Sequence, residues 1–200
     1  SLVLLQGAIG GVLAGIGLTQ GGLLWMAPAL ALLWSVSRSS GASCLWGALA
    51  VLLSHRWLLA LHPLAWIGVP AVLSFPVAAS IWLFCGAAAA VLVGLWAWLG
   101  TWLAHTATRD GGFRAKAFHL LLMASIWGLA EVLLARLPLF WIGVGGSLLP
   151  DDRALAGLAR WFGAGGLATV QLLIGWWLWQ TLLAWRRGIG WRRPLVLGLL

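Results

Sequence analysis

The sequence predicts an all-α protein, a polytopic bundle of transmembrane helices with about six complete spans and the start of a seventh. Composition is the first reason: 62% of the residues are hydrophobic and 8% are charged, whereas a soluble domain carries about a quarter charged residues. The second is that residues 1–37, the segment between Arg38 and Arg56, and the segment between Arg56 and Arg109 hold no formally charged side chain. The third is the lack of strand alternation, which leaves helices to satisfy the backbone in hydrocarbon.

The first two spans are expected at residues 2–18 and 22–36. Together they are too long for one crossing, and residues 19–22 (TQGG) between them are typical of a turn. Within the first span, glycines recur every four residues from Gly7 to Gly15. One face of that helix is therefore bare, which favours close approach by the backbone of a neighbouring helix.

A third span is expected at residues 42–61 and a fourth at residues 77–99. Between them, three prolines from Pro63 to Pro76 remove backbone donors. We therefore expect most of this stretch at the membrane surface or in a re-entrant segment buried by protein. The fourth span ends in three tryptophans between Trp96 and Trp102, which suit the interfacial aromatic belt of a membrane protein.

The remaining spans are expected at residues 117–135 and 161–185, and a seventh begins at Pro194. Residues 1–200 therefore form a single transmembrane domain. Because the chain begins without Met and ends inside a new apolar run, we interpret it as a fragment of a longer protein.

The net charge of +8 indicates orientation in a membrane rather than a nucleic-acid partner. Basic residues concentrate in every second connection between spans, and positively charged loops stay in the cytoplasm. This pattern places the N-terminus in the cytoplasm and directs the seventh span outward. The basic residues of these connections are Arg38, Arg109, Arg114, Lys116, Arg186, Arg187, Arg192 and Arg193.

Glu131 is the only acidic residue expected inside a span, and it lies five residues before Arg136. A carboxylate within a membrane is costly, so its presence suggests a function. A structural alternative remains open. In that alternative Glu131 lies at the outer interface, where it is paired with Arg136 or capped by the following loop.

The histidines and cysteines give no indication of a metal or a cofactor, and we expect neither. Two histidines are expected near the outer face and two near the inner face, and their spacing is not that of metal ligands. Cys44 and Cys85 differ in expected depth by on the order of 10 Å, which is too far for a disulfide. Both are interpreted as packing residues. The histidines are His55, His62, His105 and His119.

A series of landmarks runs through the second half of the chain. It comprises Trp127, Glu131, Arg136, Phe140-Trp141, the turn Gly145-Gly146-Ser147, Pro150-Asp151 and residues 161–166 (WFGAGG). The order of these landmarks resembles that of the bacterial apolipoprotein N-acyltransferases, the membrane enzymes that complete lipoprotein maturation. Residues 26–30 (MAPAL) and 191–196 (WRRPLV) are also similar to that family's opening hairpin and to its link into the seventh span.

The resemblance implies a nitrilase-like domain, inserted on the outer side after the seventh span and carrying a Glu-Lys-Cys catalytic set. Its cysteine thiolate would take an acyl chain from a phospholipid and pass it to the α-amino group of an apolipoprotein's diacylglyceryl-cysteine. We expect no catalytic residue in this chain. Its sole lysine, Lys116, is expected on the cytoplasmic side, and neither cysteine is expected outside. The acyltransferase would exist only as the complete protein.

The resemblance also implies roles for residues near the outer face. Phe140, Trp141 and Gly145 would border a lipid entrance, and Glu131 with Arg136 would hold the loop that carries them. The implied partners are a phospholipid acyl donor, a lipid-anchored apolipoprotein acceptor and the bacterial plasma (inner) membrane, with no nucleic acid.

Two other classes of protein are considered. A small transporter would show an internal repeat and polar groups that converge at mid-membrane, and the sequence has neither. A non-catalytic membrane scaffold remains an alternative. An outer domain with Glu, Lys and Cys beyond Leu200 would distinguish the enzyme from the scaffold.

Overall fold

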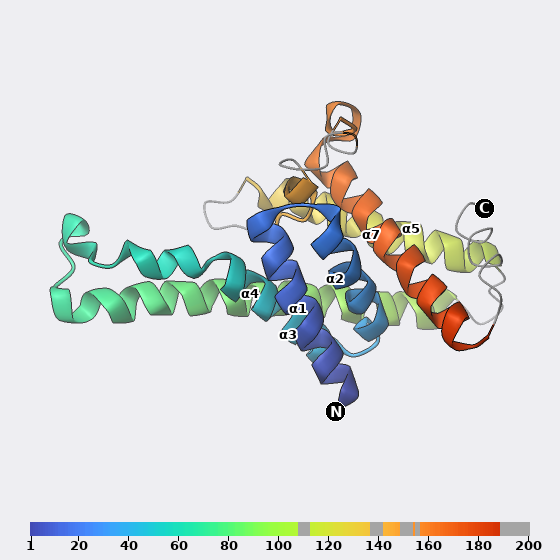
Figure 1. Cartoon of the computed structure of the whole chain (residues 1–200), viewed down its shortest axis with the longest axis horizontal. Helices are drawn as coiled ribbons and strands as arrows, with labels where there is room; N and C mark the ends of the chain where they lie inside the picture. Colours follow the sequence, from blue (N-terminus) through green and yellow to red (C-terminus); the bar gives the residue numbers. More distant parts are fainter. Residues whose placement is uncertain (108–112, 137–141, 149–153, 155–156, 189–200) are drawn as a thin grey trace.

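The computed structural model describes residues 1–107, 113–136, 142–148, 154 and 157–188. Every regular element within these ranges is a helix (Figure 1). The α-helices are α1 (Leu2–Gln20), α2 (Leu23–Val36), α3 (Ser40–Ser54), α4 (Ala71–Ala107), α5 (Phe113–Leu134) and α7 (Ala159–Arg186). The 3₁₀ helices are η1 (Arg56–Leu61), η2 (Leu64–Ile67) and η3 (Gly145–Leu148).

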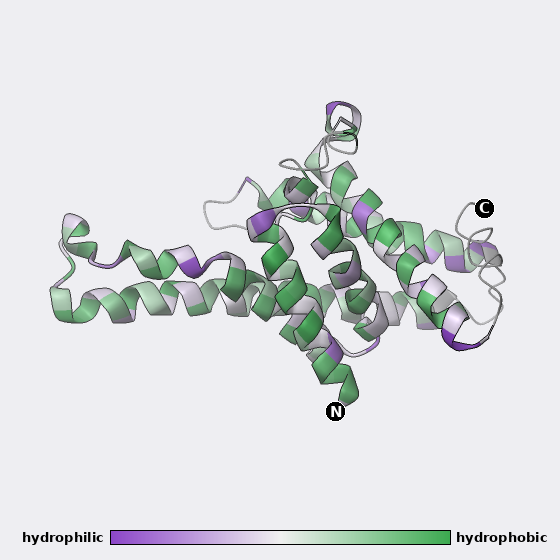
Figure 2. Ribbon diagram, in the orientation of Figure 1, coloured by the Kyte–Doolittle hydropathy of each residue, from purple (hydrophilic) through white to green (hydrophobic). Residues whose placement is uncertain are grey.

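Helices α1, α4, α5 and α7 are long and apolar enough to cross a membrane, and α2 and α3 are shorter apolar helices. In the most apolar window of each long helix, only 28–33% of the residues are buried inside the bundle. The others are at least partly exposed, and Figure 2 shows hydrophobic colour over most of the helix surface that faces the viewer. Helices with this property are surrounded by lipid. The prediction of an all-α transmembrane bundle is confirmed.

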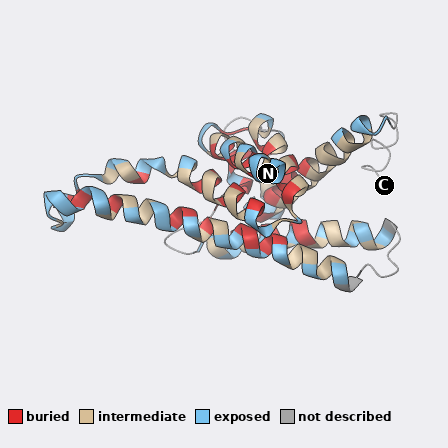
Figure 3. Cartoon of the chain, turned by 90° about the horizontal axis from the view of Figure 1, so that it is seen from below, coloured by how far each residue is buried: buried red, intermediate tan, exposed pale blue. Residues whose placement is uncertain are grey.

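The helices pack so that α3 lies between α1 and α4, while α7 contacts both α2 and α5. Buried residues gather where these helices meet, and the outward faces and the ends are exposed (Figure 3). Helix α4 has 37 residues, a length of about 55 Å, which exceeds the roughly 30 Å of a bilayer's hydrocarbon. Its first half runs beside η1 and η2 at one end of the molecule (Figure 1).

The turn between α1 and α2 consists of two glycines. Gly21 has φ 81° and Gly22 has φ 93°, a backbone conformation that side chains with a Cβ rarely adopt. The N–H of Gly21 donates to the carbonyl of Gly17 at 2.9 Å and so ends the helix. The expected turn at residues 19–22 is therefore present, and α1 runs into it as far as Gln20.

The glycine face of α1 packs against the backbone of α3. A Cβ on Gly11 would lie 2.5 Å from the carbonyl oxygen of Trp46, and a Cβ on Gly15 would lie 2.6 Å from the Cβ of Leu53. These distances are too short for any side chain, so the two helices touch backbone to backbone. The predicted close approach is confirmed, and its partner is α3.

Two helices differ from the expected spans. Helix α3 ends at Ser54, and residues 56–61 form η1 instead of continuing it. Helix α4 begins at Ala71, six residues before the expected start, with Pro76 inside it. A proline beyond the first turn removes one backbone hydrogen bond and crowds the carbonyl four residues earlier. Ser74 in the same turn joins the helix to η2, because its hydroxyl accepts a bond from the N–H of Leu64 at 2.6 Å.

A chain of tryptophans forms the centre of the bundle. The rings of Trp34 and Trp96 lie 5.2 Å apart, those of Trp96 and Trp127 lie 5.4 Å apart, and those of Trp127 and Trp46 lie 6.1 Å apart, all edge to face. Edge-to-face pairs place the positive ring edge on the negative ring face. The chain therefore connects α2, α4, α5 and α3.

The indole N–H groups of this chain also join helices. Trp34 donates to the carbonyl of Leu172 at 2.9 Å, and Trp96 donates to that of Met123 at 3.0 Å. The expectation of an interfacial position is wrong for Trp96, which is 6% exposed. Neighbouring Trp98 is 54% exposed, as an interfacial residue would be. Trp96 thus lies on the face of α4 that packs inward, and Trp98 lies on the face that turns outward.

A substitution at Gly11 tests the backbone contact between α1 and α3. We expect Gly11→Ala to destabilise the protein by about 1–3 kcal/mol, because the added Cβ forces the helices apart. The control is Gly41→Ala near the start of α3, where nothing lies within 4 Å of the new Cβ. Thermal unfolding in detergent measures both variants, and equal stabilities would contradict the contact.

Candidate functional site

Glu131 is a buried acidic residue near the end of α5, with only 5% of its surface exposed. Its Oε1 accepts hydrogen bonds from the indole N–H of Trp127 at 3.1 Å and from the N–H of Val144 at 2.6 Å. Its Oε2 accepts a bond from the N–H of Gly145 at 3.0 Å. These three donors replace the water that a buried carboxyl group loses.

The position of Glu131 makes these donors necessary. The helix ends at Leu134, and the carbonyls of a helix's last turn carry a partial negative charge that disfavours an acidic side chain. The two backbone N–H groups come from the segment 142–148, which follows α5 in the chain. Glu131 therefore ties this segment to the end of the helix. The structural alternative gave Glu131 two possible partners, Arg136 or the loop that follows the helix. The observed hydrogen bonds are those to the loop.

Gln171 holds the same segment from the opposite side. It lies on α7 and is fully buried, with 0% exposure. Its Nε2 donates to the carbonyl oxygen of Val144 at 2.6 Å, and its Oε1 lies 3.4 Å from the hydroxyl of Ser147. The Ser147 hydroxyl also donates to the Val144 carbonyl at 2.7 Å. The segment 142–148 is thus bound by side chains of two different helices.

The segment 142–148 also contacts the turn between α1 and α2 and the start of α7. The N–H of Gly22 donates to the carbonyl of Ser147 at 2.8 Å. Gly145 lies against the backbone of Ala164, with no room for a Cβ. Gly143 has φ 70°, where a side chain would be strained. Contacts on three sides fix the position of this segment relative to the helices.

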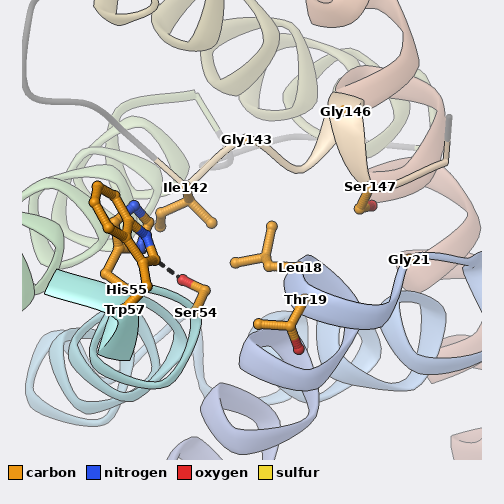
Figure 4. Close-up of a pocket in the computed structure, with 10 residues that line it drawn as sticks. All are labelled: Leu18, Thr19, Gly21, Ser54, His55, Trp57, Ile142, Gly143, Gly146 and Ser147. Carbon is orange, nitrogen blue, oxygen red and sulfur yellow. Dashed lines mark hydrogen bonds between the residues drawn. The ribbon is translucent and has the colours of Figure 1, made fainter. Parts of the chain in front are cut away.

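A pocket of about 300 Å³ opens beside the segment 142–148 (Figure 4). Its walls come from the ends of α1 and α3 and from the segment itself, so it lies at the end of the bundle where these helices stop. Within it, the hydroxyl of Ser54 lies 2.8 Å from Nδ1 of His55. The residues that line it are Leu18, Thr19, Gly21, Ser54, His55, Trp57, Ile142, Gly143, Gly146 and Ser147.

The residues proposed from the sequence fall into three groups. Glu131 and Gly145 are buried and joined by a hydrogen bond. Arg136 is exposed in the turn after α5, and the hydrogen bonds that Glu131 accepts come from other residues. Phe140 and Trp141 lie outside the described residues. They directly precede Ile142 in the sequence, at the start of the fixed segment.

Sequence reasoning missed Gln171, and it named Ser147 in a turn without giving it a role. A signal for Gln171 was present, because an amide side chain in an apolar span is costly and needs a partner. The partner could not be found from the sequence, since Val144 lies 27 positions away. In the described part of the chain, no three His, Cys, Asp or Glu residues lie close enough to hold a metal ion.

The fold and this site define an integral membrane protein of the all-helical class, in which a buried carboxyl group fixes a loop at one end of the bundle. Curated relatives show which proteins this chain is similar to. The chain is 80% identical, over all of its 200 residues, to 40% of the apolipoprotein N-acyltransferase of Prochlorococcus marinus (strain MIT 9313). It is 58% identical over 92% of its length to 38% of the same-named protein of Parasynechococcus marenigrum (strain WH8102).

A third relative, from another strain of Prochlorococcus marinus, is 47% identical over 98% of the chain and bears the same name. The chain spans about two fifths of the length of these relatives. It is homologous to part of the apolipoprotein N-acyltransferases, and the resemblance seen in the sequence is confirmed. No family model matches the chain, and no solved structure matches it.

Substitutions at Glu131 and Arg136 separate loop capping from an ion pair. We expect Glu131→Gln to destabilise the protein by about 1–3 kcal/mol, because an amide cannot accept all three hydrogen bonds and leaves a buried donor without an acceptor. Arg136→Gln, on the exposed turn, should change stability by less than about 0.5 kcal/mol. Thermal unfolding of both variants in detergent checks this, and equal losses would favour the ion pair instead.

Proposed function

We propose that this chain is the membrane domain of an apolipoprotein N-acyltransferase. The complete protein would transfer an acyl chain from a phospholipid to the N-terminal diacylglyceryl-cysteine of apolipoproteins, the last step of lipoprotein maturation. The observation that carries this proposal is the 80% identity to a protein of that name over the whole chain. The helical bundle with apolar outward faces supports it.

In this proposal the bundle holds the catalytic domain and aligns its substrates, and the acyl transfer takes place in a domain outside this chain. The Glu-Lys-Cys set would belong to a nitrilase-like domain outside this chain, so the thiolate attack on the phospholipid ester takes place there. The bundle would keep that domain at the outer leaflet and admit both lipid-anchored substrates sideways from the bilayer. Confining two reactants beside the thiol raises their effective concentration.

Phe140 and Trp141 would border the lipid entrance. Three observations support this role. They precede the segment 142–148 directly, that segment is held by Glu131 and Gln171, and a pocket opens beside it. A fixed segment beside the entrance would not have to be ordered when a lipid binds, which lowers the cost of binding.

The proposed location is the bacterial plasma (inner) membrane, with the N-terminus in the cytoplasm. The clustering of basic residues in alternate connections supports this orientation. The ends of α1, α3 and α5, and with them the pocket and the segment 142–148, would then face the outer side. The proposed partners are a phospholipid donor and a lipid-anchored apolipoprotein acceptor.

The lipid-entrance role predicts a loss of activity at Trp141. In the full-length protein we expect Trp141→Ala to reduce acyl transfer at least about tenfold, because the ring would contribute about 1.4 kcal/mol or more to substrate binding. Thermal stability should stay unchanged. The control is Trp66→Ala, which removes a 73% exposed tryptophan from η2.

The assay follows a labelled acyl chain from phospholipid to a diacylglyceryl-cysteine peptide in proteoliposomes. If Trp141→Ala transfers the acyl chain as fast as the unmodified protein, Trp141 does not border the lipid entrance. No transfer by the unmodified full-length protein would refute the acyltransferase and favour the scaffold.

The orientation is tested by labelling in intact cells. Gly146 is exposed, with nothing within 4 Å of an added Cβ, so Gly146→Cys offers an accessible thiol. We expect a membrane-impermeant maleimide added outside to label it and to spare Lys116→Cys, an exposed position at the start of α5. The unsubstituted protein gives the background from Cys44 and Cys85. The reverse pattern would show the opposite orientation.

A further inference from the structure

The peptide group between Val144 and Gly145 is held on both sides by side chains. The N–H groups of Val144 and Gly145 donate to Glu131 on α5, at 2.6 and 3.0 Å. The carbonyl of Val144 accepts from Gln171 on α7, at 2.6 Å. One rigid peptide plane is therefore bound to two helices at once, and it can shift only if one of these bonds breaks.

The two helices that hold this peptide are themselves in backbone contact. A Cβ on Gly165 of α7 would lie 2.5 Å from the carbonyl oxygen of Gly128 on α5. The hydroxyl of Thr169 on α7 lies 3.3 Å from the carbonyl of Ala124 on α5 and adds a hydrogen bond to the crossing. The distance between α5 and α7 is thus fixed. Because Gln171 is on α7, its hydrogen bond ties the position of the segment 142–148 to that of α7.

The surroundings of Gln171 indicate that its amide serves alignment more than folding. An amide buried in an apolar helix is costly unless its polar atoms are used, and both are used here. The Val144 carbonyl also accepts a bond from the Ser147 hydroxyl at 2.7 Å. Removing the amide therefore leaves this carbonyl bonded, and an apolar side chain of similar size would still fill the space.

We propose that Gln171 is a positioning residue for acyl transfer, which aligns the segment 142–148 at the lipid entrance by fixing the Val144 carbonyl. This inference rests on the proposed function. Val144 shares this peptide with Gly145, which would border the entrance, and the pocket beside it is lined by Ile142, Gly143, Gly146 and Ser147. A displacement of the Val144 carbonyl therefore moves Gly145 and the adjoining wall of the pocket with it.

The test is a pair of matched substitutions on α7 in the full-length protein. Gln171→Met removes the amide and keeps the length of the side chain, and Gln180→Met makes the same change nine positions further along the helix. We expect Gln171→Met to raise KM for a diacylglyceryl-cysteine peptide about tenfold, because a displaced segment 142–148 no longer holds the entrance in its binding geometry. Its kcat should stay within about twofold, and Gln180→Met should behave as the unmodified protein.

A conservative variant provides the rescue. In Gln171→Glu, a protonated carboxyl group can donate to the Val144 carbonyl, whereas an ionised one repels it. Burial favours the neutral form of such a group. Measured relative to the unmodified protein at each pH, KM of this variant should be near normal at low pH and should rise as the pH increases.

Three results would overturn the inference. The first is an equal KM in the two methionine variants. The second is a fall of kcat and thermal stability together with the rise in KM, because that pattern shows a purely structural role. The third is a KM of Gln171→Glu that does not change with pH relative to the unmodified protein. Failure of the unmodified protein to transfer acyl chains would refute the proposed function itself, and this inference with it.

Discussion

The hydrogen bonding of the Glu131 carboxyl group is the constraint on which the end of the bundle depends. An acidic side chain in the last turn of an apolar helix has neither water nor favourable helix charge around it. It is stable there only because Trp127, Val144 and Gly145 supply donors. Satisfying one carboxyl group thereby fixes a segment of irregular backbone at a defined place. Such backbone is tolerated at a membrane protein's end when protein groups complete its hydrogen bonds.

The lack of water as a hydrogen-bond partner also determines how the helices pack inside the bundle. Hydrophobic attraction does not favour one helix contact over a lipid contact, so packing and hydrogen bonds must select the neighbours. Glycines on α1 let α3 approach to backbone contact at Gly11. Tryptophans then fill the wider gaps and donate to helix carbonyls, as Trp34 and Trp96 do. Small and very large residues therefore have complementary tasks in this bundle.

Rigid packing of this kind fixes the shape of one end of the bundle. The segment 142–148 is bound by α5, by α7 and by the turn at Gly22. Each of these contacts involves a different part of the sequence, so the position of the segment depends on all three. A pocket lies beside it where helix ends meet (Figure 4). The fold thus provides a fixed rim at one end of an otherwise apolar body.

The sequence by itself determined the all-α transmembrane class of the fold and the glycine face of α1, because lipid imposes strong rules on length, charge and apolar content. Tertiary structure alone decided what Glu131 binds, that Gln171 holds the same segment, and that Trp96 lies in the core. These are pairings between helices far apart in the chain. Periodicity within one helix shows which face is small or polar, but the partner of that face depends on how all the helices pack.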